Sequence, residues 1–176
     1  MPQGSILAPL LYIVSAHDIP THPQTLLASF ADDKTLLASH KNHTQASHIL
    51  QQHLDSVYEW CTLWKVQLNN TKSQHITFTL RRQTCPPVHI NNQYIPQTDT
   101  VRYLGMTLDR RLTWASHTRN TKQAITRRIK SLYSLLHPKS KLNVNQKLNI
   151  YKYLIKPIWT YGIQIYGAAK NTHNSS

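Results

Sequence analysis

The chain has 176 residues, of which 40% are hydrophobic and 15% charged, a balance that is typical of a folded protein and excludes an intrinsically disordered one. No apolar run approaches the length of a membrane-spanning helix, and the N-terminus lacks the basic-then-apolar pattern of a signal peptide. Two cysteines, Cys61 and Cys85, are too few for a disulfide framework, so we expect an intracellular, reducing compartment, either nucleus or cytoplasm.

The formal net charge of +13 is concentrated in the last part of the chain. Residues 1–101 contain six basic and six acidic residues, whereas residues 102–176 contain fourteen Lys and Arg and one acidic residue, Asp109. Such a basic region is typical of proteins that bind a phosphate backbone, because each neutralised phosphate releases counterions. A merely solvated basic face is the alternative. A membrane surface is disfavoured, since it would require an amphipathic helix with interfacial aromatic residues.

The first predicted element is a helix that begins near Ser5 and ends near Ala16. Ser5 is a suitable N-cap, because its hydroxyl can accept a hydrogen bond from the first turn. The preceding residues Pro2, Gln3 and Gly4 form a loop, for which proline and glycine are well suited.

Two adjacent carboxylates, Asp32 and Asp33, stand between the apolar runs Thr25–Phe30 and Thr35–Ser39. This pattern predicts a β-hairpin that carries both carboxylates in its tight turn. Ionised carboxylates beside a packed core cost free energy unless a positive charge neutralises them. A divalent cation would do so, and hard oxygen ligands favour Mg²⁺. An ordinary solvated turn is the alternative for an Asp-Asp pair taken alone.

A long helix is expected from Thr44, its predicted N-cap, to about Lys65. Apolar residues recur there at steps of three and four and predict one buried stripe. The stripe consists of Ala46, Leu50, Leu54, Val57, Cys61 and Trp64, and it favours packing over base stacking for Trp60 and Trp64. Zinc is disfavoured, because the nearby histidines lack a cysteine pair and a second cluster at suitable spacing. These histidines are His40, His43, His48 and His53.

Three stretches after this helix predict β-structure. Gln74–Leu80 alternates like a half-buried strand, and Val88–Ile90 and Tyr94–Ile95 flank Asn91-Asn92, which is favourable turn chemistry. Val101–Leu108 predicts a further strand, within which a glycine indicates either a close backbone approach or a bulge.

From Thr113 onward the pattern becomes helical. Apolar residues form one face, while the basic residues Arg119, Lys122, Arg127, Arg128 and Lys130 lie mostly elsewhere. The apolar face consists of Ala124, Ile125, Ile129, Leu132, Leu135 and Leu136. His137-Pro138 is expected to end this helix, and Asn143 to cap another, which Pro157 kinks or stops. An aromatic segment, Trp159–Tyr166, follows.

Four motifs resemble those of reverse transcriptases, with the best match to the non-LTR retrotransposon type (jockey-like elements). They are Pro2-Gln3-Gly4-Ser5-Ile6-Leu7-Ala8-Pro9-Leu10-Leu11-Tyr12, Phe30-Ala31-Asp32-Asp33, Leu68-Asn69-Asn70-Thr71-Lys72-Ser73 and Tyr103-Leu104-Gly105-Met106. Their order makes the resemblance specific over residues 2–106. Ile150–Gly167 resembles the basic region that follows the polymerase, although less specifically.

The resemblance implies an RNA-directed DNA polymerase, a nucleotidyltransferase that uses a two-metal Mg²⁺ site. It implies that Asp32 and Asp33 are catalytic and bind metal. Gln3, Gly4 and Lys72 are implied to bind the nucleotide, and Tyr103, Leu104 and Gly105 to form a primer grip. The implied partners are an RNA template, a DNA primer and deoxynucleoside triphosphates, with no membrane and no small-molecule cofactor other than the metal.

Two residues depart from the pattern of the resembled family. Ala8 stands where the family usually has glycine, and Lys34 stands where a small or apolar residue is more common. We expect Lys34 to be able to form an ion pair with Asp33 and thereby compete with a metal ion.

The expected fold is α+β: a partial polymerase palm with antiparallel hairpins over residues 1–109, a helical, basic thumb-like region over residues 113–167, and a polar tail over residues 168–176. In the resembled family a third aspartate, on a strand upstream of the Pro-Gln-Gly-Ser loop, completes the metal site. We therefore expect a fragment that is inactive by itself. A catalytically inactive, basic nucleic-acid-binding remnant of a retroelement is the alternative, and a purely structural domain is a third hypothesis.

Overall fold

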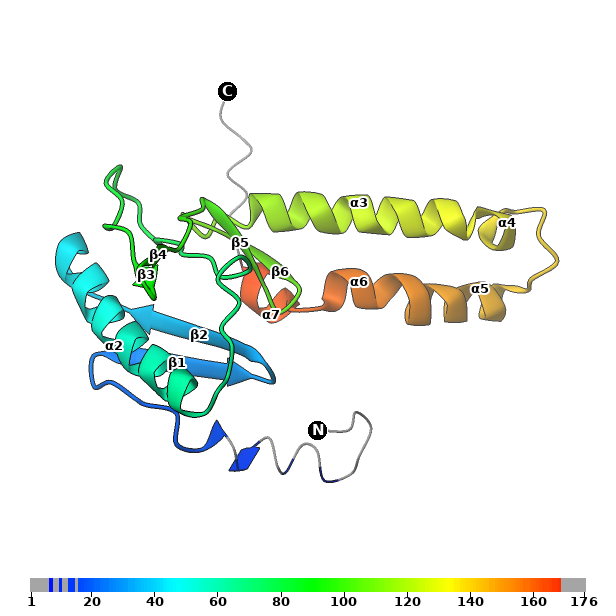
Figure 1. The fold of residues 1–176 in the computed structure, drawn as a ribbon. Helices are drawn as coiled ribbons and strands as arrows, with labels where there is room; N and C mark the ends of the chain where they lie inside the picture. Colours follow the sequence, from blue (N-terminus) through cyan, green and yellow to red (C-terminus); the bar gives the residue numbers. More distant parts are fainter. Residues whose placement is uncertain (1–6, 8–9, 11–12, 15, 169–176) are drawn as a thin grey trace. The chain divides into compact units, whose positions relative to one another are not determined.

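The structure, a computed structural model, describes residues 7, 10, 13–14 and 16–168 (Figure 1). The chain divides into two compact units, one of Met1–Thr77 with Arg81–Thr98 and one of Phe78–Leu80 with Asp99–Ser176. Each unit combines helices with short antiparallel hairpins, so the predicted α+β class is confirmed. The predicted Ser5–Ala16 helix lies largely outside the described residues. The assignment of palm and thumb to parts of the chain stays a prediction.

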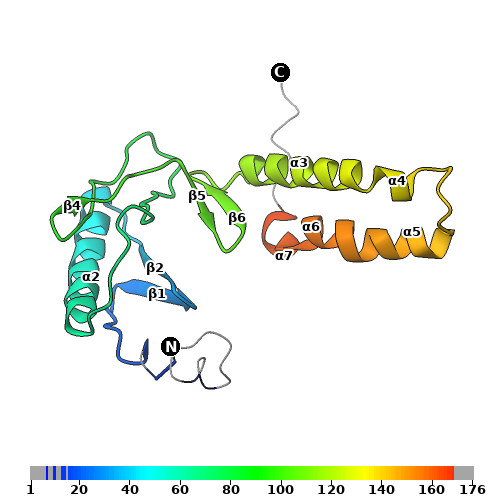
Figure 2. The ribbon, with the colours of Figure 1, turned by 45° about the vertical axis from the view of Figure 1, so that its right-hand side comes forward.

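The first unit is built from the hairpin of β1 (Thr25–Phe30) and β2 (Asp33–Ala38) and the long helix α2 (His43–Leu63), which packs against it (Figures 1 and 2). The strands pair antiparallel from Thr25 opposite Ala38 to Phe30 opposite Asp33. The predicted hairpin is therefore confirmed. Its turn is shorter than expected, because β2 begins at Asp33, and only Ala31 and Asp32 connect the strands.

The core of the first unit lies around α2. One cluster joins Leu54 to Val88, Ile90 and Ile95, and another joins Ile19, Val57 and Cys61. Partly buried Leu36 and Leu68 pack against both clusters. The predicted stripe is buried at Leu54, Val57 and Cys61, whereas Trp64 at its end is 50% exposed. The indoles of Trp60 and Trp64 donate to the two carboxylate oxygens of Asp18, at 3.1 and 3.2 Å.

Helix α2 is capped by Asn42, so the prediction of Thr44 as N-cap was wrong by two residues. The Asn42 side chain accepts a hydrogen bond from the Thr44 backbone N–H at 2.8 Å, which satisfies one unpaired donor of the first turn. Thr44 therefore donates its backbone N–H to the cap and is not the capping residue, and the helix begins at His43.

His53 attaches α2 to the segment that leads into β1. Its side chain is fully buried, and its Nε2 donates to the Pro20 carbonyl at 2.8 Å, because a carbonyl can only accept. Nδ1 then accepts from the Thr25 hydroxyl at 2.5 Å. Gln51 attaches the same helix to His89 through a donated and an accepted hydrogen bond of 2.9 and 2.8 Å.

A second hairpin, of β3 (His89–Ile90) and β4 (Gln93–Tyr94), is turned by Asn91-Asn92 as predicted. Both asparagines have a positive φ, 49° and 57°, which is the pattern of a type I′ turn. The predicted strand Gln74–Leu80 was wrong. The segment makes only an isolated bridge between His75 and Gln97, because its chain crosses into the second unit at Phe78, where Thr79 donates to the Arg110 carbonyl.

The second unit begins with a hairpin of β5 (Thr100–Tyr103) and β6 (Met106–Asp109). A single strand over Val101–Leu108 was therefore wrong, because Leu104 and Gly105 adopt positive φ values and reverse the chain. The Asp109 carboxylate then accepts backbone hydrogen bonds from Thr113 and Trp114 at 3.0 and 2.9 Å. Burial raises the pKa of Asp109, but these hydrogen bonds outweigh it and the pKa is lowered.

Helices complete the second unit: α3 (Ala115–Ser131), α4 (Tyr133–Leu136), α5 (Val144–Ile150), the π-helix η1 (Tyr151–Ile155), α6 (Lys156–Thr160) and α7 (Ile163–Tyr166). Helix α3 packs against η1 and α6, which return alongside it (Figures 1 and 2). The predicted Asn143 cap is confirmed, as a capping box with Gln146. Pro157 does not stop the helix; it lies in the first turn of α6, immediately after the π-helix. No helix among the described residues is long and apolar enough to cross a membrane.

Candidate functional site

The Asp32-Asp33 pair lies at the tip of the β1–β2 hairpin, and both side chains are exposed. Asp32 is the second turn residue, and Asp33 is the first residue of β2, paired with Phe30. Ala31, the first turn residue, has a φ of 49° in the left-handed region, which is strained for a residue with a Cβ atom. The hairpin thus presents two neighbouring carboxylates to solvent from a short turn.

Lys34 is positioned on the other face of the hairpin from Asp33, since successive side chains in a strand alternate. Its ammonium donates to the Ala31 carbonyl at 2.9 Å and so bridges the turn. Lys34 is on the same face of β2 as Leu36, which packs against the core clusters around α2. Burial raises the pKa of the Cys61 thiol, and the charge of Lys34 opposes this effect. The expected competition between Lys34 and a metal ion stays a prediction.

The two carboxylates offer hard oxygen ligands of the kind that a divalent cation prefers. Among residues 16–168 and the few described positions before them, no three side chains of His, Cys, Asp or Glu converge as a metal-binding group. The carboxylates of Asp32 and Asp33 could therefore supply some, but not all, of the ligands of a divalent cation.

The predicted nucleotide-binding residues are placed in part. Gln3 and Gly4 lie outside the described residues. Lys72 is exposed in a compact turn after α2, where its backbone N–H donates to the Asn69 carbonyl and side chain, both at 3.2 Å. Leu68, just before this turn, packs against the same core clusters as Leu36 of β2. The Lys72 turn and the carboxylate hairpin therefore share one core.

The predicted primer-contacting residues form the β5–β6 turn of the second unit. Leu104 and Gly105 are its central residues, with φ values of 45° and 79°. The Tyr161 hydroxyl donates to the Leu104 carbonyl at 2.6 Å, although 57 residues separate them. Sequence reasoning missed Tyr161, whose only signal was its position in the aromatic segment Trp159–Tyr166.

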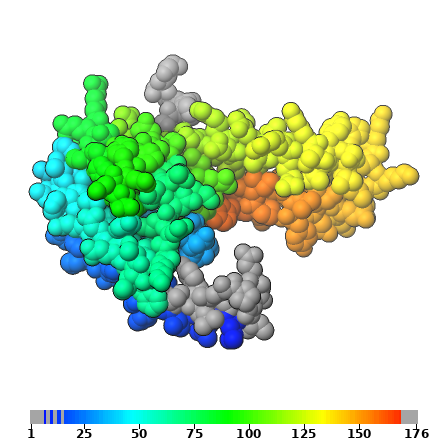
Figure 3. All heavy atoms as spheres, in the orientation of Figure 1, coloured from blue at the N-terminus to red at the C-terminus, as the bar shows by residue number. Residues whose placement is uncertain are grey.

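The basic residues of the helices are mostly exposed. The predicted apolar face is half-buried at Ala124, Ile125, Leu132 and Leu136, whereas Ile129 and Leu135 are 42% and 43% exposed. Exposed basic side chains occur on α3, η1 and α6: Arg119, Lys122, Arg127, Arg128, Lys130, Lys152 and Lys156. Figure 3 shows these helices as adjoining rows of atoms, in yellow-green to orange. Exposed Lys and Arg side chains are the groups that neutralise phosphates in nucleic-acid-binding proteins.

Comparison with known proteins identifies the class. Residues 1–108 match the family described as "Reverse transcriptase (RNA-dependent DNA polymerase)". The RNA-directed DNA polymerase from mobile element jockey of Drosophila melanogaster is 39% identical over 98% of this chain and 20% of its own length. The probable RNA-directed DNA polymerases from transposons X-element and BS of the same species are 38% and 37% identical, over 98% and 99% of this chain and 20% of each relative.

The chain therefore belongs to the reverse transcriptase family, among the enzymes of non-LTR, jockey-like retrotransposons. It spans about a fifth of the length of these curated relatives. No solved structure is significantly similar to it. Membership in the family implies a divalent metal in general, consistent with the exposed carboxylate pair.

Proposed function

We propose that this chain forms part of an RNA-directed DNA polymerase and supplies two of the carboxylates that bind its metal ions. The observation that carries the proposal is the exposed pair Asp32 and Asp33 at the tip of a hairpin, within the part that matches the family. Mg²⁺ is the preferred cation for such ligands. When bound, the cations would activate the primer's 3′-hydroxyl and neutralise charge on the triphosphate.

The other proposed roles belong to the nucleotide-binding and primer-contacting residues of this chain. Lys72, held by its turn on the carboxylate-bearing unit, would attract the triphosphate and favour release of pyrophosphate, and Gln3 and Gly4 would approach the nucleotide. Tyr103, Leu104 and Gly105 would hold the primer's 3′ end. The basic helices would follow the backbones of the RNA template and DNA primer.

The test replaces the matching fifth of the jockey polymerase by residues 1–176 and measures primer extension on an RNA template. Asp32→Asn is expected to abolish extension, because charge neutralisation by metal contributes several kcal/mol to the transition state. Asp33→Asn should reduce it less. Asp55→Asn is the matched control, since Asp55 is an exposed aspartate of α2.

Metal binding is tested separately on residues 1–176. Mn²⁺ should broaden the amide signals of Asp32 and Asp33 in the wild-type chain and not in Asp32→Asn. The alternative function, an inactive remnant that only binds nucleic acid, is favoured by the basic helices alone. It predicts that the chimaera is inactive with Asp32 intact and that binding of nucleic acid is unaffected by Asp32→Asn.

A further inference from the structure

The turn between β5 and β6 holds a residue in an unfavourable conformation. Leu104 and Gly105 both have positive φ, 45° and 79°, which is the pattern of a type I′ turn. Glycine adopts this region freely, but leucine rarely does, because its Cβ atom crowds the backbone. In the β3–β4 turn the same pattern is carried by Asn91-Asn92, and asparagine tolerates it. A strained leucine persists only where its surroundings hold it.

The group that holds this turn is Tyr161. Its hydroxyl donates to the Leu104 carbonyl at 2.6 Å, so the hydrogen bond acts on the strained residue itself. A Cβ atom at Gly105 would lie 3.3 Å from Tyr161 Cε1, so the ring also lies against the second turn residue. The next residue continues the contact, because a Cβ atom at Gly162 would lie 2.7 Å from Met106 Sδ.

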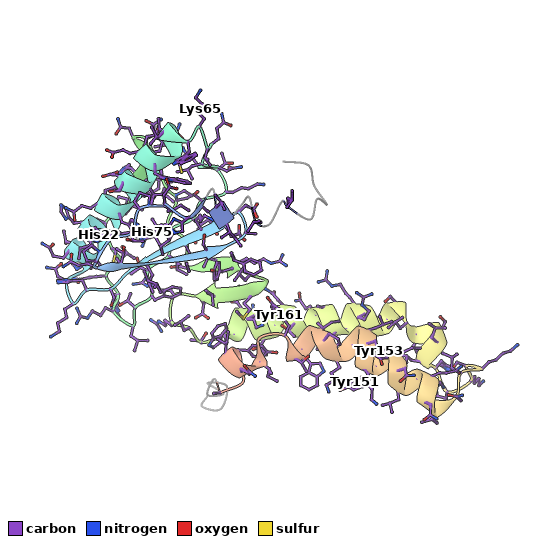
Figure 4. The ribbon with its side chains drawn as sticks, turned by 90° about the horizontal axis from the view of Figure 1, so that it is seen from below. His22, Lys65, His75, Tyr151, Tyr153 and Tyr161 are labelled. Carbon is purple, nitrogen blue, oxygen red and sulfur yellow. The ribbon has the colours of Figure 1, made fainter. Side chains whose placement is uncertain are left out.

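Tyr161 is not a core residue. Its side chain is 54% exposed, and the contacts just described involve its hydroxyl and one edge of its ring. Figure 4 shows it beside the β5–β6 hairpin, while Tyr151 and Tyr153 lie farther along the helical part of the same unit. Tyr161 therefore contributes little buried area, and its main contact is the hydrogen bond to the carbonyl of the strained residue Leu104.

We propose that Tyr161 is a positioning residue that keeps the Leu104-Gly105 turn in the conformation that contacts the primer's 3′ end. The inference rests on the proposed function of Tyr103, Leu104 and Gly105. Because Tyr161 lies between α6 and α7, it joins the turn directly to the segment that carries the basic helices. The proposed primer-contacting turn is therefore linked through Tyr161 to the same segment as the basic helices.

The first experiment measures amide hydrogen exchange by NMR in the 176-residue chain. Tyr161→Phe keeps the ring and removes the hydroxyl, and it is expected to speed exchange at Gly105 and Met106 by about three- to tenfold, the factor that a typical neutral hydrogen bond gives. Tyr153→Phe is the matched control, since Tyr153 is a 74% exposed tyrosine in η1. The Asn91-Asn92 turn is an internal reference. Equal exchange in wild type and Tyr161→Phe overturns the inference.

The second experiment asks whether Tyr161 acts on the strained leucine. Leu104→Asn places a residue that tolerates positive φ at the same position. In that background Tyr161→Phe should change exchange at Gly105 and Met106 by less than about twofold, because asparagine adopts the turn with less strain and depends less on the Tyr161 hydrogen bond. An effect as large as in the wild-type background would show that Tyr161 supports something other than this turn, and would overturn the inference.

The third experiment connects the turn to the primer. A DNA primer with a photoreactive 4-thiothymidine at its 3′ end is annealed to an RNA template and crosslinked to the chain. Crosslinks are expected within residues 103–106, and Tyr161→Phe should reduce them at least about twofold while total binding is unchanged. Crosslinks at the turn that Tyr161→Phe leaves unaltered overturn the positioning role. Wild-type crosslinks only elsewhere overturn the proposed primer contact, even if the exchange experiment shows that Tyr161 holds the turn.

Discussion

The Lys34 ammonium donates to the Ala31 carbonyl across the turn that carries Asp32, at 2.9 Å. This bond places a positive charge against the backbone of the turn. The hydrogen bond supports the turn, and we expect the same charge to oppose binding of a metal ion at the carboxylates.

We expect Lys34→Met to strengthen Mn²⁺ binding at the carboxylates by about two- to threefold, because the removed charge acts through a mostly aqueous surface. The measurement is the Mn²⁺ concentration that half-broadens the Asp32 and Asp33 amide signals. Lys41→Met removes the same charge from an exposed loop and should leave this concentration unchanged. Weaker binding in Lys34→Met would mean that support of the turn outweighs the charge.

Ala31→Gly is expected to stabilise the chain by about 0.5–1 kcal/mol, because glycine adopts the φ of 49° without strain. Urea unfolding followed by circular dichroism measures the change. Ala38→Gly, at the end of β2, is the control and should destabilise by a similar amount, since its backbone is not in the left-handed region. A loss of stability in Ala31→Gly would contradict the strain at this turn.

Stability should fall as the pH is lowered through the histidine range. Burial lowers the pKa of His75 and of His117 below the ordinary value of 6.5, so the unfolded chain binds more protons than the folded one. Their contribution is therefore present above about pH 6.5 and is lost as the pH falls below it. His117 Nδ1 also accepts from the Thr107 N–H at 3.3 Å, which protonation would prevent.

Urea unfolding at about pH 7.5 and about pH 5.5 measures this dependence. His117→Gln should reduce the difference between the two stabilities without removing it, because His75 still contributes. His48→Gln, an exposed position on α2, should not alter it. Equal stability of the wild-type chain at both pH values would contradict the burial effect.

Binding of nucleic acid should fall steeply with salt and depend on the basic helices. Replacing Arg127, Arg128 and Lys130 of α3 by glutamine should lower the slope of log affinity against log salt by up to about 2–3, the contribution of three phosphate contacts. The matched control replaces Lys41, Lys65 and Arg82, three exposed basic residues of the first unit. An equal effect of both triple variants would show that binding follows net charge and not this surface.

Sequence reasoning predicted the elements whose signals are local. The β1–β2 hairpin, the Asn91-Asn92 turn and the Asn143 cap each depend on a few adjacent residues, and all three are confirmed. The strand over Gln74–Leu80 failed because alternation does not show whether a partner strand is present. The sequence predicts one strand in place of the β5–β6 hairpin because leucine is an unexpected turn residue, and Tyr161, which bonds to Leu104, lies 57 residues away.

In the candidate site, too, the features with a local sequence signal could be predicted and those that depend on distant contacts could not. The carboxylate pair could be predicted from its motif, since the residues that define it are adjacent. The charge of Lys34 is evident from the sequence, but its bond to Ala31 depends on a turn two residues shorter than expected. Tyr161 left no local signal, because its role depends on a contact between distant segments.

Helix α2 is hydrogen-bonded through its side chains to several parts of the first unit. His53 bonds to Pro20 and Thr25, Gln51 bonds to His89, and the Trp60 indole bonds to Asp18. Loss of this helix would release the segment before β1, the carboxylate hairpin and β3 at the same time. We therefore expect the carboxylate turn to lose its structure together with the rest of the first unit when α2 unfolds.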